Sequence, residues 1–307
     1  MKIGCVIQGD YRRGTDQVLR HLPKIFDHTI FSTWEEDLGV IPDGNFSVIA
    51  SKKPKIPGLA NRNLQRFSTA RGINLAKELG CDYILKWRSD MLPARLDLEK
   101  LIRWANFDVS PMMKSRLVMP AFRNLSVEPD YFSSIPDLFS FADTCLMEML
   151  WGDSGFNYDS PINMPSAILN SEILSGVNRD LLGAYYPPES ELYALLKDKL
   201  QLFLGFEISH NKFILDYCRL FNENRLNIYW FNSMRGFRSI RQGYEHPWWT
   251  EKDWQSKNSM IHDFGYPVKG FKSNFLRLLG PLLARSNEMY QSLSWLRRSR
   301  IKKKDSK

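Results

Sequence analysis

Short apolar runs alternate with polar connections over the first 90 residues, and several of the runs are rich in β-branched residues. This pattern is typical of a parallel sheet whose strands are joined by helices. The apolar runs predict strands at residues 3–7, 28–32, 47–50, 82–87 and 116–120. The spacing of apolar and small residues predicts helices at 15–22, 61–79, 97–105 and 189–204. We therefore expect an α/β fold.

Local signals are expected to set the ends of these helices. Thr15 is predicted to cap the first helix, and Gly80 to end the second. Pro187 and Pro188 precede the helix at 189–204; prolines at this point end the preceding segment and favour the start of a helix. Residues 153–178 are rich in Pro, Asn and Ser, so we expect a variable insertion or a substrate-covering loop there.

Polar residues follow three predicted strands directly. They are Gln8 and Gly9 after the first strand, Ser32, Thr33 and Trp34 at the end of the second, and Arg88, Ser89 and Asp90 after the fourth. In open α/β sheets, ligands bind at the carboxyl ends of the strands. We expect these three polar loops to line one edge of the sheet.

Asp90 has the position that a metal bridging two phosphates would need, because it offers a hard oxygen ligand at the end of a rigid strand. It could equally be a simple turn residue. Lys86 and Arg88 are two residues apart and therefore share one face of the strand, whereas Trp87 faces the other way. A cation on that face could pair with a phosphate or with Asp90.

Composition and charge narrow the class of protein. With 307 residues, of which 43% are hydrophobic, the chain can bury a real core, which excludes a disordered or fibrous protein. The net charge of +8 suggests nucleic-acid binding. However, residues 1–268 carry 31 Lys and Arg against 32 Asp and Glu, whereas residues 269–307 carry 11 against 2. The near-neutral body argues against nucleic acid as a partner.

The basic tail has the pattern of an amphipathic helix. Its apolar positions are Phe275, Leu278, Leu282, Met289, Leu293 and Leu296, and its last cationic positions are Arg297, Arg298, Arg300 and Lys302 to Lys304. Such a segment can rest on an anionic membrane surface. Alternatively, the apolar stripe docks onto the domain and only the last ten residues are solvated.

Cysteine usage and hydropathy favour a cytosolic compartment. The four cysteines, Cys5, Cys81, Cys145 and Cys218, include no CxxC pair, so structural zinc is not expected and reduced thiols are. The chain starts with an apolar stretch of only five residues, too short for a signal peptide. No apolar run reaches 18 residues, so no membrane span is expected.

Several segments, taken together, resemble the WavE family of lipopolysaccharide-synthesis proteins, which in turn resembles GT-A glycosyltransferases. They are IQGDY at 7–11, FSTW at 31–34, NRNLQRFST at 61–69, YILKWRSDM at 83–91, PDLFSF at 136–141, SELY at 190–193 and HNKFILD at 210–216. The resemblance covers about residues 1–220. It implies a GT-A-like, Rossmann-like and mostly parallel sheet flanked by helices, followed by a helical basic C-terminal extension.

The resemblance implies a set of donor-binding residues. They are Gln8, Gly9, Ser32, Thr33, Trp34, Asn61, Asn63, Gln65, Arg66, Lys86, Arg88 and Asp90. Leu64 stands where the family usually has an arginine, so whether Arg62 or Arg66 faces a pyrophosphate stays open. The position after Gln8 and Gly9, commonly proline, is Asp10.

The resemblance also implies a divalent cation, Mn²⁺ or Mg²⁺, with Asp90 as its ligand, because Asp90 matches the last acid of the GT-A DxD motif. Arg88 replaces the first acid of that motif. An arginine could itself neutralise part of the charge of a leaving diphosphate.

Asp137 and Glu191 are the candidate catalytic residues, since they match the acids of the family's D-x-F-x-F and E-x-Y segments. An inverting transfer needs a carboxylate as general base near the acceptor hydroxyl. Glu189 is a second choice to Glu191. Asp137 could instead be a turn residue after Pro136, and Glu191 an acid favoured by the dipole in a first helical turn.

The sequence thus predicts a glycosyltransferase domain at residues 1–268 and a basic amphipathic tail at 269–307. The expected reaction moves a sugar from a nucleotide-sugar donor to a lipopolysaccharide core, O-antigen or capsular polysaccharide acceptor. The expected location is cytoplasmic and peripheral, on the inner face of a bacterial plasma membrane. The alternative is a non-catalytic partner of the same fold in a membrane-associated surface-polysaccharide assembly.

Overall fold

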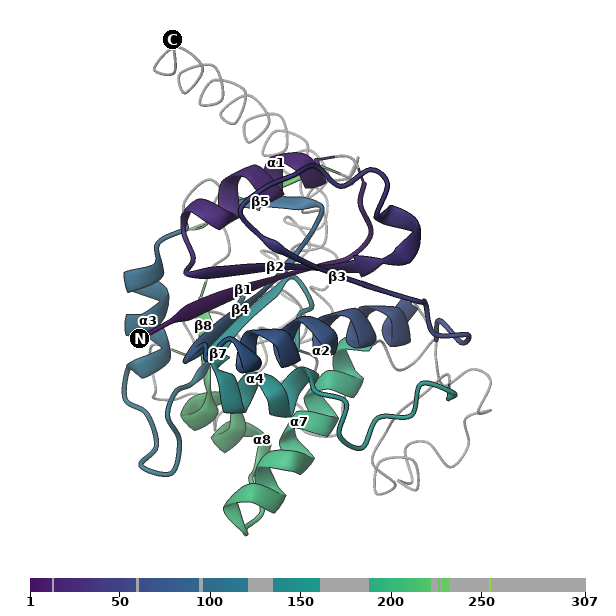
Figure 1. Ribbon diagram of the computed structural model, residues 1–307. Helices are drawn as coiled ribbons and strands as arrows, with labels where there is room; N and C mark the ends of the chain where they lie inside the picture. The colour runs from purple at the N-terminus through teal and green to yellow at the C-terminus, as the bar shows by residue number, and fades with distance from the viewer. Residues whose placement is uncertain are drawn as a thin grey trace, which may run out of the picture.

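A mixed seven-stranded sheet forms the centre of the molecule, with strand order β3-β2-β1-β4-β7-β6-β8 (Figure 1). The computed structural model describes residues 1–12, 14–58, 61–93, 96–120, 135–160, 188–221, 226, 228–231 and 254. A second sheet pairs β5 with β9. The predicted tail at 269–307 and most of the predicted loop at 153–178 lie outside the described residues.

The strands are short, as is usual for a sheet of this kind. Their bounds are β1 (Ile3–Gln8), β2 (His28–Trp34), β3 (Ser47–Ser51), β4 (Tyr83–Arg88), β5 (Met91–Pro93), β6 (Leu117–Pro120), β7 (Phe139–Asp143), β8 (Cys218–Phe221) and β9 (Ile228–Trp230). The α-helices are α1 (Thr15–His21), α2 (Arg62–Glu78), α3 (Leu98–Asn106), α4 (Thr144–Trp151), α7 (Pro188–Leu204) and α8 (His210–Lys212). Short 3-10 turns follow α1 and β2, and a π-helical turn, Phe213–Tyr217, follows α8.

The pairing of the strands brings the carboxyl ends of β1, β2 and β4 together. β1 is parallel to both β2 and β4, and Gln8 is in register with Ser32 on one side and Arg88 on the other. β7 runs antiparallel to β4 and pairs Ser140 with Lys86. The segment that precedes β7 therefore returns to the same edge of the sheet and carries Asp137 there.

Alternation along the strands divides the core between the two faces of the sheet. On one face, Val6 and Ile84 pack in a cluster with residues of α2, α4 and α7. On the other face, Cys5 and Trp87 pack in a cluster with residues of α1 and α3. Figure 1 shows α1 on one side of the sheet and α2, α4 and α7 on the other. Helices on both faces explain why the central strands are almost entirely apolar.

The predicted α/β class, with a mostly parallel sheet flanked by helices, is confirmed. The predicted strands and helices agree with the observed ones to within one residue at most ends. The predicted cap at Thr15 is wrong: Gly14, with φ of 87°, precedes the helix, and the Thr15 hydroxyl accepts a hydrogen bond from the Arg12 amide (3.0 Å). Gly80 ends α2 as predicted, with φ of 73°.

The elements β7 and α4 were not predicted from the sequence. All five residues of β7 are buried, and its alternation of apolar and polar residues, Phe139-Ser140-Phe141, covers only three positions. Asp143 ends the strand and also caps α4, because its Oδ1 accepts hydrogen bonds from the amides of Cys145 (3.0 Å) and Leu146 (3.3 Å).

Within the described ranges, no helix is both long enough and apolar enough to cross a lipid bilayer.

We expect Gly72→Ala to lower the free energy of unfolding by about 1 kcal/mol or more. Gly72 lies inside α2, and a Cβ there would be 2.3 Å from Cγ1 of Val6 on β1. Helix propensity alone predicts the opposite sign, since Ala is favoured over Gly by about 1 kcal/mol. Urea unfolding measures the change.

Gly39→Ala is the matched control, because no atom lies within 4 Å of its added Cβ. The double variant Val6→Ala/Gly72→Ala should recover part of the lost stability. A stabilised Gly72→Ala protein would show that α2 can move away from β1 at little cost.

Candidate functional site

Charged and amide side chains from four parts of the fold meet at the carboxyl ends of β1 and β4. We call them the strand-end cluster: Asp10, Arg12, Gln65, Arg88, Asp90 and Asp137. Asp10 and Arg12 follow β1, Arg88 and Asp90 lie at the end of β4, Gln65 comes from the first turns of α2, and Asp137 precedes β7. The parallel pairing of β1 with β4 explains this convergence.

Arg88 is the centre of the cluster. Its Nε donates to Asp90 Oδ1 (3.1 Å) and its Nη2 to Asp90 Oδ2 (3.2 Å), while its Nη1 donates to Asp137 Oδ2 (2.8 Å). Arg12 Nη1 lies 3.6 Å from Asp90 Oδ2 on the other side. The Asp90 side chain is only 2% exposed, whereas those of Arg88 and Arg12 are 22% and 36% exposed. The two guanidinium groups therefore form the accessible part of this pairing.

Asp137 is held by three neighbours. Gln65 Nε2 and Arg88 Nη1 both donate to its Oδ2, and Lys86 Nζ donates to its backbone carbonyl oxygen. Burial alone would raise the pKa of Asp137, but Arg88 and Lys86 outweigh it and hold that pKa below its ordinary value. The carboxylate is therefore ionised at neutral pH. Conversely, Asp137 and Asp90 raise the pKa of Arg88 against the effect of its burial.

Lys86 lies beneath the cluster and is fully buried. Its Nζ lies 4.9 Å from the centre of the Trp151 ring, within range of a cation–π interaction. Burial lowers the pKa of Lys86 to about 8; nearby Asp137 opposes this shift, and Arg88 adds to it. Lys86 and Arg88 thus share one face of β4, as predicted, and Trp87 stacks on Phe139 on the other face.

The loop after β1 is tied to β2 and β4 through Asp10. Trp34 Nε1 donates to Asp10 Oδ1 (2.5 Å), Arg12 Nη2 donates to Oδ2 (3.0 Å), and the Ser89 hydroxyl donates to its carbonyl oxygen (2.9 Å). Gly9 has φ of 126°, and a Cβ there would be 2.7 Å from the Ser89 hydroxyl oxygen. Only glycine allows the chain to turn this close to β4.

The structure brings together some of the donor-binding residues predicted from the sequence. Gln65, Arg88 and Asp90 belong to the cluster itself, and those that border it are Gln8, Gly9, Trp34 and Lys86. Ser32 and Thr33 lie at the end of β2, where Ser32 Oγ donates to the Ser68 carbonyl oxygen (2.6 Å) and the Thr33 hydroxyl donates to Asp37.

The other predicted residues have contacts elsewhere. Asn61 is exposed at the start of α2, with φ of 63°. Asn63 and Arg66 contact residues 152–160. Glu191 forms an ion pair with Arg62, and both side chains are at most 4% exposed. As placed, Glu191 ties the start of α7 to α2 rather than to the strand-end cluster.

Sequence reasoning did not assign Arg12 and Asp37 to the site. Both lie in turns after strand ends, which is the only local signal they carry. Asp37 accepts hydrogen bonds from the Tyr11 amide (3.0 Å) and from Thr33, so it links the loops that follow β1 and β2. Asp10 was noted only as a departure from a family pattern, yet it makes three of the contacts that shape the loop.

The donor set at Asp90 does not fit a divalent cation in this arrangement. Both carboxylate oxygens of Asp90 accept hydrogen bonds from Arg88, and Arg12 lies close by, so cations already surround it. Among the described residues, no group of three or more His, Cys, Asp or Glu side chains could hold a metal ion. We therefore derive no step of the chemistry through a metal.

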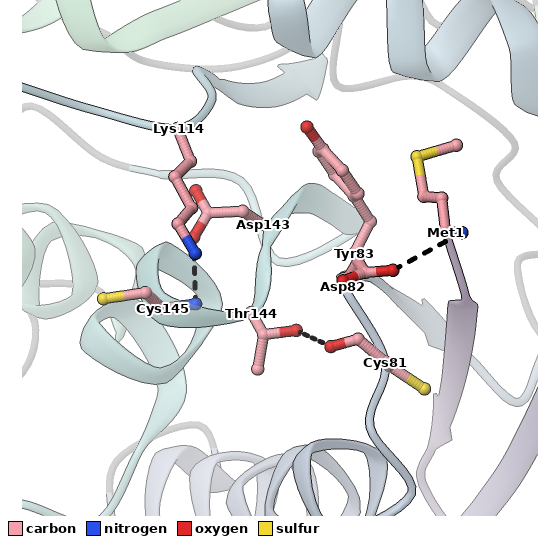
Figure 2. Close-up of a pocket in the computed structure, with 8 residues that line it drawn as sticks. All are labelled: Met1, Cys81, Asp82, Tyr83, Lys114, Asp143, Thr144 and Cys145. Atoms are coloured by element: carbon pink, nitrogen blue, oxygen red, sulfur yellow. Dashed lines mark hydrogen bonds and ion pairs between the residues drawn. The ribbon is translucent and has the colours of Figure 1, made fainter. Parts of the chain in front are cut away.

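A separate pocket of about 480 Å³ lies at the opposite edge of the sheet (Figure 2). It is lined by Met1, Cys81, Asp82, Tyr83, Lys114, Asp143, Thr144 and Cys145. Several of its polar groups are already paired: the Thr144 hydroxyl donates to the Cys81 carbonyl oxygen, and Asp82 lies 3.8 Å from the Met1 amino group. Since Cys81 and Asp82 precede β4, this pocket has no contact with the strand-end cluster.

The chain was compared with known proteins. No family model matches it, and no curated protein matches it either. A cytidylyltransferase from Leptospira borgpetersenii is 16% identical, with 56% of this chain and 73% of that chain covered and a TM-score of 0.32.

Two further solved structures are similar at the same low level. One is described as mannose-1-phosphate geranyltransferase from Thermus thermophilus (12% identity, 61% and 69% covered, TM-score 0.33). The other is S. aureus TarS (11% identity, 70% and 44% covered, TM-score 0.37). At identities of 16% or less and TM-scores of 0.37 or less, these similarities carry no argument about activity.

The titration of Lys86 predicts how stability depends on pH. The pKa of Lys86 is about 8 in the folded protein against an ordinary value of 10.5, so the unfolded chain binds more protons between these values. The free energy of unfolding should therefore rise with pH across this window by roughly 3 kcal/mol through this group. Lys86→Met removes that contribution, and urea unfolding at a series of pH values from 7 to about 11 measures it.

The exposed Lys52→Met variant is the control and should follow the wild-type curve. If the curves of wild type and Lys86→Met ran parallel across this window, the buried lysine would not titrate there.

Proposed function

We propose that this chain is a glycosyltransferase of GT-A-like fold that uses a nucleotide-sugar donor. The observation that carries the proposal is the pair of partly exposed guanidinium groups, Arg88 and Arg12, at the carboxyl ends of β4 and β1. This edge is where open α/β sheets bind their ligands. Two arginines held by carboxylates at fixed positions suit the recognition of a diphosphate, whose charge grows as it leaves the sugar.

In this proposal, Arg88 exchanges partners when the donor binds. Without a ligand, Asp137 and Asp90 compensate its charge. A bound diphosphate would compete with Asp137, which is the more exposed partner at 19% against 2% for Asp90. Asp90 would keep the guanidinium in place, while Asp137 would lose the larger of the two charges that hold its pKa low.

Asp137 is the proposed general base. An ionised carboxylate with a low pKa accepts protons poorly, so the release of Arg88 toward the diphosphate would make it a better base for the acceptor hydroxyl. Gln65 and Lys86 remain to orient it after that exchange. Glu191 was the other predicted catalytic residue, but its buried pairing with Arg62 favours a structural role.

The divalent cation expected from the sequence is not part of this proposal. Arg88 and Arg12, which both lie beside Asp90, would supply the positive charge that a metal supplies in metal-dependent transferases. We expect donor turnover to persist in excess EDTA. A strict requirement for Mn²⁺ or Mg²⁺ would mean that Asp90 leaves Arg88 to bind the metal.

The acceptor class and the cellular location rest on sequence. The resemblance of the motifs to the WavE family favours a lipopolysaccharide core, O-antigen or capsular polysaccharide precursor as acceptor. The basic residues of 269–307 favour attachment to the cytoplasmic face of a bacterial plasma membrane. A non-catalytic role in a surface-polysaccharide assembly is the alternative that the activity assays distinguish.

Arg88→Gln should lower the rate of donor turnover by about 100-fold, as expected for the loss of one charge-stabilising group in a transition state. The measurement is hydrolysis of a panel of common nucleotide sugars, with Mn²⁺ and with EDTA. Asp137→Asn should cause a similar loss if Asp137 is the base. Arg20→Gln, on the exposed face of α1, is the matched control and should leave the rate unchanged.

The enzyme proposal fails if no common nucleotide sugar is turned over and no nucleotide raises the melting temperature. An Asp90→Ala protein with full activity would show that the site lies elsewhere.

Membrane attachment is tested by the triple variant Arg297→Gln/Arg298→Gln/Arg300→Gln. Each basic residue near an anionic surface contributes about 1 kcal/mol, so the loss of three should weaken binding by roughly 100-fold at low salt. Co-sedimentation with vesicles rich in phosphatidylglycerol measures it, and phosphatidylcholine vesicles and the Arg71→Gln variant are the controls. Equal binding of the triple variant and the wild type would exclude the tail as the attachment site.

A further inference from the structure

Arg66 is a buried cation outside the strand-end cluster. It lies on α2, one residue after Gln65, and its side chain is 2% exposed. Its guanidinium carbon lies 4.5 Å from the centre of the Phe156 ring, and its Nη2 makes a long hydrogen bond to the Gly152 carbonyl oxygen (3.4 Å). The donor chemistry assigned to Arg88 and Asp137 does not use this side chain.

Most of the hydrogen-bonding capacity of Arg66 is unused. Its Nε and Nη1, which carry three of the five N–H groups of a guanidinium, have no hydrogen-bond partner. It also has no ion-pair partner among the described residues. A buried charge without such partners is costly, and proteins rarely keep one unless something else compensates it.

The surroundings of Arg66 are well ordered by other contacts. Asn63 Nδ2 donates to the carbonyl oxygens of Tyr158 (3.1 Å) and Ser160 (2.9 Å), which fastens residues 152–160 to the start of α2. The rings of Phe67 and Tyr158 meet edge to face at 5.1 Å. The Tyr158 hydroxyl donates a hydrogen bond to Asp153 Oδ1, so one of the two carboxylate oxygens of Asp153 is already used. These contacts hold the guanidinium in place without satisfying it.

Lys199 of α7 is a second, half-buried cation, and its positive charge interacts with that of Arg66. Burial lowers the pKa of Lys199 to about 8, and the positive charge of Arg66 adds to the shift. Burial likewise lowers the pKa of Arg66 to about 10, although Glu191 and Asp153 oppose it. Glu191 pairs with Arg62, and Glu148, which also acts on Lys199, pairs with Lys77, so Asp153 is left to balance Arg66 and Lys199. Among these described side chains, one positive charge is in excess.

We propose that Arg66 and Lys199 form a binding site for a small oxyanion of the phosphate or carboxylate type, between α2, α7 and residues 152–158. Such an anion would accept hydrogen bonds from the free N–H groups of Arg66 and balance the excess charge. The site is separate from the strand-end cluster and does not depend on the function proposed for it. A water molecule could accept one of these bonds but would leave the charge uncompensated.

The test is thermal unfolding of the full chain with inorganic phosphate, with sodium acetate, or with sodium chloride at the same ionic strength. Saturating phosphate should raise the melting temperature of the wild type by about 5 °C. Arg71→Gln, an exposed arginine of the same helix, is the matched control and should show the same rise. Arg88→Gln should also keep the rise, because that variant changes only the strand-end cluster. If Arg88→Gln abolished the rise and Arg66→Met kept it, the phosphate would bind at the strand-end cluster and the proposal would be wrong.

Arg66→Met should abolish the rise, and its melting temperature in chloride alone should equal or exceed that of the wild type, because an uncompensated buried charge has been removed. Lys199→Met, at a half-buried position, should reduce the phosphate affinity about 10-fold, as measured by calorimetry. If Arg66→Met fails to fold, this variant tests the proposal in its place. A rise with acetate in place of phosphate would identify a carboxylate ligand. Equal phosphate responses in all variants, or no response of the wild type to either anion, would overturn the proposal.

Discussion

The bidentate pairing of Arg88 with Asp90 is the interaction on which the rest of the site depends. Asp90 is buried at the end of the central strand β4, where an uncompensated carboxylate would be costly. Arg88 satisfies both of its oxygens and still reaches Asp137, so one guanidinium links β4 to the segment before β7. The other carboxylates and amides of the cluster are arranged around this group.

The antiparallel strand β7 makes that arrangement possible. A fifth parallel strand beside β4 would have brought its own carboxyl end to the site, whereas β7 brings the residues that precede it. Asp137 therefore reaches Arg88, and the ammonium group of Lys86, on β4, donates a hydrogen bond to the Asp137 carbonyl oxygen. A cation with a lowered pKa beside a carboxylate with a lowered pKa is the kind of pairing that occurs at functional sites.

Local sequence carried enough information to predict much of the sheet and part of the cluster. The strands β1, β2 and β4 are apolar runs that end in polar residues, so the convergence of Gln8, Trp34 and Arg88 follows from parallel pairing alone. The pairing of Glu191 could not be anticipated in this way, because its partner, Arg62, is 129 residues away. β7 was not predicted because its alternation, Phe139-Ser140-Phe141, is only three residues long, and the strand is defined by its pairing with β4.

The sequence by itself determined the α/β class, the edge of the sheet at which polar residues gather, and the separation of a near-neutral body from a basic tail. These are properties of local patterns, which are set by residue types and their spacing. Only the tertiary structure decided which charge compensates which: Arg88 with Asp90 and Asp137, Arg62 with Glu191, and Arg66 with no ion-pair partner among the described residues. Charge compensation depends on distances and burial that arise when distant segments pack together, and no local pattern encodes them.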